Sequence, residues 1–145
     1  MAWNNLDLEC ALAAEAIVTP LRDKITQQEM EKLCADSTAV LVEYGTYAFF
    51  LYLQARSVKG QKKQKESAPY GIQEQTFKLL SRQLGLAASP GGEEPWGSMI
   101  AKIANLSEDL NRLLLAKALI TRTLDYTRYH AKTLPKKLSQ NAPEG

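Results

Sequence analysis

The sequence predicts an all-α protein, a single compact bundle of about five to six helices. Apolar residues recur every three or four positions through most of the chain, which is the period of an amphipathic helix. No window alternates strictly between apolar and polar residues as a half-buried strand does. A length of 145 residues, 45% of them hydrophobic, is typical of one domain with a core of its own. We therefore expect a helical bundle over residues 1–134 and a disordered tail over 135–145.

The N-terminal segment predicts two short helices. The first runs over residues 5–18, where apolar residues keep helical spacing and Pro20 marks the end. Thr26 and Glu29 have the spacing of a capping box, in which a hydroxyl and a carboxylate accept hydrogen bonds from free backbone amides at a helix start. We therefore expect a second helix over residues 26–34.

The third expected helix, from Asp36 or Ser37 to about Val58, is the most apolar segment of the chain. Its composition also suits a strand, but helical segments flank it and no second strand is predicted to pair with it. Gly45 costs a helix up to about 1 kcal/mol relative to alanine, and would be tolerated where a neighbouring backbone comes close. One stripe of this helix is expected in the core. Its aromatic side is expected to contact another subunit, because exposed apolar patches usually mark interfaces; the residues predicted for that contact are Tyr44, Phe49 and Tyr52.

The second half of the chain predicts three more helices separated by loops. Lysine, glutamine and serine dominate the first loop, and prolines and glycines fill the second. Gly85 is typical of a residue that ends a helix. In chain order we expect a loop over 59–70, a helix over 71–84, a loop over 88–97, a short helix over 98–104, and a final long helix from Asn105 or Ser107 to just before Pro135.

The final helix has three faces when its residues are placed at intervals of about 100°. One apolar stripe includes Ile120 and Leu124, and a second includes Leu119 and Tyr126. The third side is polar and basic, and it carries Lys117, Arg128 and Lys132. Because an ordinary surface helix buries one stripe, a helix of this kind is either central in its domain or contacts a partner. The pattern favours a binding subunit over an enzyme.

The net charge of +2 conceals an uneven distribution along the chain. Residues 1–50 hold three Lys or Arg against eight Asp or Glu, a net charge of −5, whereas residues 51–145 hold fifteen against eight, a net charge of +7. A protein polarised in this way can orient on a polyanion or stack on its own copies. The alternative is that the lysines only keep the surface soluble.

The sequence brings together no residues that catalysis requires. His130 has no acidic residue on its face of the helix, and no phosphate loop, dinucleotide fingerprint or zinc spacing occurs. Cys10 and Cys34 lack metal-ligand spacing and are expected to be reduced, buried thiols. The chain start lacks the pattern of a signal peptide, and the longest apolar run, 47–53, is too short to span a membrane. We expect a cytoplasmic protein that is not an enzyme and uses no metal or cofactor.

The order of these blocks resembles the small α-helical subunit of type III-B (Cmr) CRISPR effector complexes, which act in antiviral defence. Residues 11–16 resemble the alanine-rich opening helix of that family, and residues 40–53 resemble its glycine-centred apolar helix, which a short basic turn follows. Residues 113–131 are similar to its closing helix, with an aromatic and basic end. Tyr44 and Thr46 flank the glycine where the family commonly has Asn and Leu, which leaves open the small subunit of another type III subtype.

The resemblance implies a non-catalytic subunit that stacks in several copies along an RNA-guided ribonucleoprotein and contacts guide and target RNA, mainly through their backbones. From Lys117 to Lys132 the final helix spans about 22 Å, which reaches several phosphates. Arg122 could instead be held by Tyr126 through a cation–π contact. The alternative function is a helical homo-oligomeric scaffold or regulator without direct RNA contact. The candidate RNA-binding residues are Lys117, Arg122, Arg128 and Lys132 on the final helix, and Arg56, Lys59, Lys62 and Lys63 around the lysine-rich loop.

Overall fold

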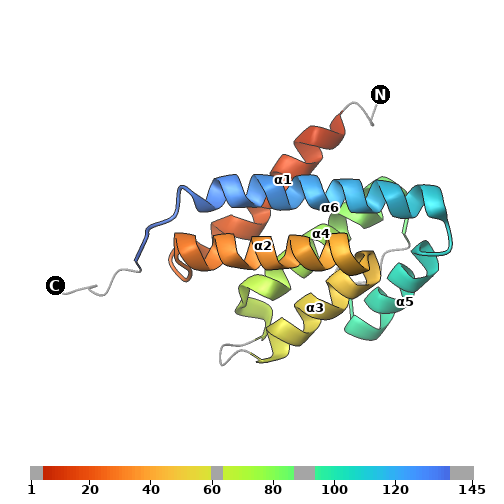
Figure 1. The fold of residues 1–145 in the computed structure, drawn as a ribbon, viewed down its shortest axis with the longest axis horizontal. Helices are drawn as coiled ribbons and strands as arrows, with labels where there is room; N and C mark the ends of the chain where they lie inside the picture. Colours follow the sequence, from red (N-terminus) through yellow and green to blue (C-terminus); the bar gives the residue numbers. More distant parts are fainter. Residues whose placement is uncertain (1–4, 60–63, 87–93, 138–145) are drawn as a thin grey trace.

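The protein is described by a computed structural model over residues 5–59, 64–86 and 94–137, and within these ranges it contains helices and no strand. The predicted all-α bundle is therefore confirmed. The tail expected to be disordered over 135–145 is described only to residue 137, and there Pro135 O accepts a hydrogen bond from Gln27 N at 2.9 Å; residues 138–145 lie outside the described residues. The described residues form six α-helices (Figure 1): α1 (Leu6–Val18), α2 (Gln27–Tyr44), α3 (Thr46–Lys59), α4 (Ala68–Leu84), α5 (Trp96–Leu106) and α6 (Leu110–Ala131), with 3₁₀ turns at Thr19–Leu21 and Gln64–Glu66.

Helix α6 packs on α1, α2 and α4. It crosses α1, with which it packs most extensively, and it runs antiparallel beside α2 (Figure 1). Helices α3 and α4 pack on each other, α4 also packs on α1, and α5 packs on α3. The core between them includes a chain of edge-to-face rings in which the centroid of Phe50 lies 5.2 Å from that of Phe49 and 6.3 Å from that of Phe77. Of the two alternatives stated for the last helix, these contacts show the first, a central position in its domain, whereas contact with a partner stays a prediction.

The expected boundary at Asp36 or Ser37 is wrong. Helix α2 continues through both residues, and Ser37 is fully buried within it. The helix ends instead at Gly45, which has φ 99° and ψ −176°, a conformation that glycine alone adopts readily. A Cβ at this position would meet no atom within 4 Å. The backbone conformation therefore requires this glycine, and the close approach of a neighbouring backbone that we expected is absent from the described residues.

Two predicted helix ends are confirmed, the start of α2 at its capping box and the end of α4 at Gly85. Thr26 Oγ1 accepts a hydrogen bond from Glu29 N at 3.2 Å, and Glu29 Oε1 accepts one from Thr26 N at 3.0 Å, so the capping box is formed. Gly85 ends α4 in the left-handed conformation. Helix α4 begins at Ala68, before the expected residue 71, because Ser67 Oγ accepts a hydrogen bond from Tyr70 N and caps it. None of the helices in the described ranges has the length and apolar character needed to cross a membrane.

Candidate nucleic-acid interface

One broad face of α6 is buried and the rest is open. The first predicted stripe is confirmed, since Ala116, Ile120 and Leu124 are fully buried. The second stripe is divided, because Leu119 is buried whereas the Tyr129 side chain is 68% exposed. The sequence analysis missed the polar members of the buried face. These are Thr123 and Thr127, whose hydroxyls donate to the carbonyl oxygens of the residues four positions earlier, at 2.9 and 2.7 Å, and so need no water.

The basic side of α6 lies beside α2 near the end of α6. Lys132 Nζ lies 3.7 Å from Glu31 Oε2 of α2, and the carboxylate of Glu31 also accepts a hydrogen bond from Gln27 at 2.8 Å. That hydrogen bond, together with the charges of Lys132 and Arg128, holds the pKa of Glu31 below its ordinary value of 4.5. Both cations therefore share one acidic neighbour on α2.

The same side of α6 is hollowed near its C-terminal end. Asp125, Arg128, Tyr129 and Lys132 line an open depression of about 300 Å³. Lys117, more than two turns toward the helix start, is half-buried, and no acidic residue in the described ranges forms an ion pair with it. Lys117 and Arg128 thus lie on one side of α6 and Lys132 directly follows its last residue, with two acids, Asp125 and Glu31, beside the C-terminal pair.

Arg122 does not belong to this basic side. It forms an ion pair with Asp7 of α1, and Asp7 Oδ2 also accepts a hydrogen bond from Tyr126 Oη at 2.7 Å. Hydrogen bonds from Tyr126 and then from Arg122 hold the pKa of Asp7 below its ordinary value of 3.8, and the same contact raises the pKa of Tyr126. Arg122 and Tyr126 are joined through a shared carboxylate, and this contact ties α1 to α6.

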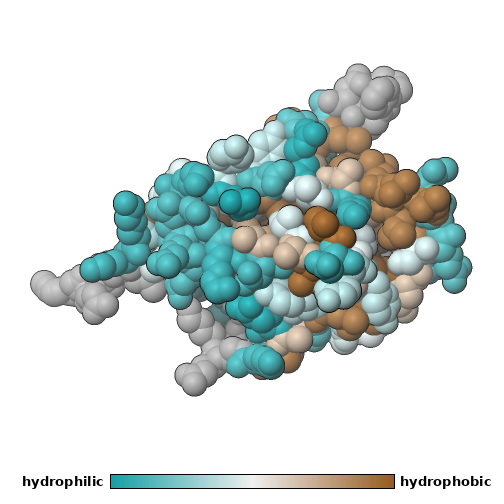
Figure 2. Space-filling model, in the orientation of Figure 1, coloured by the Kyte–Doolittle hydropathy of each residue, from teal (hydrophilic) through white to brown (hydrophobic). Residues whose placement is uncertain are grey.

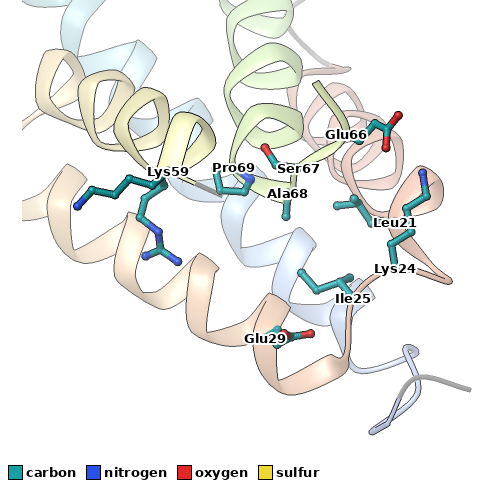
Figure 3. A pocket seen from close by; sticks show the side chains of 10 residues that line it. Leu21, Lys24, Ile25, Glu29, Lys59, Glu66, Ser67, Ala68 and Pro69 are labelled. Atoms are coloured by element: carbon teal, nitrogen blue, oxygen red, sulfur yellow. The ribbon is translucent and has the colours of Figure 1, made fainter. Parts of the chain in front are cut away.

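The basic residues of α3 occupy a second location. Arg56 Nη1 donates a hydrogen bond to Tyr52 Oη at 2.8 Å, and its guanidinium carbon lies 5.6 Å from the centre of the Tyr52 ring. Arg56 and Lys59 line a cleft of about 550 Å³ between the ends of α2, α3 and α4 (Figure 3). Lys62 and Lys63 lie outside the described residues.

The predicted subunit-contact residues divide between surface and core. Tyr44 is 75% exposed and Tyr52 is half-buried, but Phe49 is fully buried against Phe50, so the expectation that Phe49 lies on a contact surface is wrong. The reason is the break in the helix at Gly45, after which the helical phase changes.

Figure 2 shows apolar side chains gathered at the end of the molecule where α6 begins, and a hydrophilic surface where α6 ends. Further exposed apolar residues, which were not predicted to lie at an interface, include Tyr47, Leu51, Leu110 and Leu114.

Residues with catalytic or metal-binding side chains are dispersed. Within the described ranges no group of three or more His, Cys, Asp or Glu is placed to hold a metal ion. Cys10 and Cys34 are buried and unpaired, and burial raises the pKa of the Cys34 thiol from 9.0 to about 12. Such a thiol stays protonated and is a poor nucleophile.

Comparison of the chain with models of known families, with curated proteins and with solved structures found no match in any of the three. The assignment of the basic side of α6 as a candidate interface therefore depends on the geometry described above.

Proposed function

We propose that the protein is a non-catalytic small subunit of a type III CRISPR RNA-guided effector complex, in which α6 contacts the backbone of guide or target RNA. The observation that carries this proposal is the basic side of α6, on which Lys117 and Arg128 lie along one continuous helix and Lys132 directly follows it. The resemblance of the sequence to the small subunit of Cmr complexes supplies the kind of assembly.

The geometry suits contacts with phosphates better than recognition of bases. The three cations extend over about 22 Å, so each can approach a different phosphate of one strand. The ion pair between Lys132 and Glu31 does not prevent this, because the side chain of Lys132 is 56% exposed and a surface ion pair contributes little. An RNA phosphate can replace Glu31 as the partner of Lys132 at small cost to the fold.

The apolar end of the molecule supports the second part of the proposal, contact with other subunits or with copies of the same chain. Tyr44 and Leu110 are each at least two-thirds exposed at this end. A patch of exposed apolar residues usually marks a site of contact with another protein. Subunit contact is thus assigned to the apolar end of the molecule, where α6 begins, and the contacts of Arg128 and Lys132 with RNA to the end where α6 ends (Figure 1, Figure 2).

Purification of the protein from its native cell with its partners, followed by ultraviolet cross-linking and sequencing of the bound RNA, tests the proposal. We expect CRISPR guide RNA in the complex and cross-linked peptides from the half of α6 that contains Arg128 and Lys132. An oligomer of this chain that carries no RNA would favour the homo-oligomeric scaffold. A complex with guide RNA in which α6 gives no cross-link would contradict the assignment of the basic side.

A further inference from the structure

We propose that the cleft lined by Arg56 and Lys59 binds one nucleoside monophosphate unit, with its base on the apolar floor and its phosphate at these two cations. The cleft has a volume of about 550 Å³ and lies between the turn after α1 and the adjoining ends of α2, α3 and α4 (Figure 3). Sites for small molecules typically have volumes of about 300–1,000 Å³. This inference rests on the proposed function, since it names a site for a single nucleotide of RNA or for a free mononucleotide.

The floor of the cleft is apolar and fixed. Leu21 and Ala68 are 6% and 8% exposed, and Ile25 packs against the core. In Figure 3, Leu21 and Ile25 lie opposite Ala68 and Pro69 across the cleft. Aliphatic side chains on two sides of a slot can contact the two faces of a flat ring. All nucleobases have such faces, so this contact would not depend on which base is bound.

The rim supplies cations on the side of α3. Arg56 is held over the Tyr52 ring by a hydrogen bond of 2.8 Å to the hydroxyl, which fixes the direction of its guanidinium group. Lys59, three residues further along α3, also lines the cleft, and none of the acidic residues in the described ranges forms an ion pair with either cation. An oriented guanidinium beside a flexible ammonium is a suitable pair for a phosphate.

The acids of the rim limit the charge of the ligand. Glu29 lies on α2, and its Oε1 accepts hydrogen bonds from the backbone amide and the hydroxyl of Thr26. Glu66 lies at the edge opposite Lys59, beside Lys24 (Figure 3). Two carboxylates at the rim repel a highly charged group, so the cleft suits one phosphate better than a triphosphate.

The experiment is a nuclear magnetic resonance titration of the full chain with adenosine 5′-monophosphate, with adenosine, inorganic phosphate and ATP as comparison probes. We expect the monophosphate to shift the amide signals of residues 21–29, 56–59 and 64–71, and to bind more tightly than any comparison probe. Arg56→Gln combined with Lys59→Gln should weaken its binding at least about tenfold. Lys78→Gln, which removes an exposed cation elsewhere on α4, should leave binding unchanged.

Three results would overturn the proposal: no shift at millimolar monophosphate, shifts that map away from the cleft, or equal binding of inorganic phosphate alone. Competition in the assembled complex separates the two sources of the nucleotide. Displacement of RNA by the monophosphate identifies an RNA nucleotide as the occupant, whereas unchanged RNA affinity identifies a free mononucleotide. Because Lys117, Arg128 and Lys132 do not line the cleft, their replacement should leave monophosphate binding intact. Failure of the cleft and failure of the proposed RNA contact on α6 are therefore distinguishable.

Discussion

The junction between α2 and α3 and the basic side of α6 differ in what holds their side chains in place. At the junction, one glycine conformation sets the direction of α3, and Phe49 is fully buried four residues later. On α6, Lys132 is more than half exposed and reaches Glu31 at 3.7 Å. Burial of an aromatic ring contributes several kcal/mol, whereas a surface ion pair contributes about 0–1 kcal/mol. Side chains at the junction are therefore fixed by burial, whereas the cations on the basic side of α6 remain available for a ligand.

The largest expected effect comes from the ring that the sequence analysis placed at a subunit contact. Phe49→Ala should lower the free energy of unfolding by about 3–5 kcal/mol, because it leaves a cavity beside Phe50. Tyr44→Ala is the matched control, since Tyr44 is 75% exposed, and should change the free energy by less than about 0.5 kcal/mol. Chemical denaturation measures both. Similar values for the two variants would contradict the division between core and surface at this junction.

The next largest effect is expected from the backbone conformation at the junction alone. Gly45→Ala should lower the free energy of unfolding by about 1–3 kcal/mol, because alanine at φ 99° and ψ −176° is strained although space is available. Gly71→Ala is the control, since Gly71 lies within α4 with open space around it, and should raise the free energy by about 0.5–1 kcal/mol. Stabilisation by Gly45→Ala would show that α2 and α3 can join into one helix.

The same comparison shows how far the sequence could predict the structure. The helical phase of α6 was predictable because nothing interrupts its 22 residues, so the expected stripe with Ile120 and Leu124 is buried. The phase of α3 was not predictable, because periodicity does not reveal that Gly45 adopts a positive φ and resets it. The capping box at Thr26 was predictable, since both partners lie within one turn.

Contacts between residues that are distant in the chain could not be predicted from the sequence. The spacing groups Lys117, Arg128 and Lys132 on one side of α6, and in the structure Arg128 and Lys132 line one depression. The spacing also places Arg122 on a different side of the helix, among the second stripe, but its ion pair with Asp7, 115 positions away in the chain, follows from no local pattern. The cleft at Arg56 likewise depends on how α2, α3 and α4 meet.

A smaller effect should follow from the contact that ties α1 to α6. Hydrogen bonds from Tyr126 and Arg122 lower the pKa of Asp7, so Asp7 stabilises the folded state above its unfolded pKa, and this contribution is lost as the pH falls through the folded pKa. The stability difference between the wild type and Asp7→Asn should thus be constant near neutral pH and shrink below about pH 4. Thermal unfolding across this pH range measures it. An unchanged difference for Asp7→Asn at low pH would contradict the role of this contact.

The smallest effect on stability, and the most direct test of RNA contact, concerns the basic side of α6. Replacement of Lys117, Arg128 and Lys132 by alanine should leave the fold nearly unchanged. In the assembled complex it should weaken binding of all RNA sequences alike, because phosphate contacts carry no sequence information. The matched control replaces Lys78 and Arg82 of α4, two exposed cations away from this side, and should leave RNA affinity unaltered.

The measurement is a titration of RNA affinity against salt concentration for complexes that contain wild-type, triple-variant or control subunit. Each phosphate contact on single-stranded RNA contributes a log–log slope of about −0.7 through counterion release. We predict that the triple variant flattens the slope by about two units and that the control retains the wild-type slope. An unchanged slope for the triple variant, or an equal change for the control, would contradict the assignment of α6 as an RNA-binding helix.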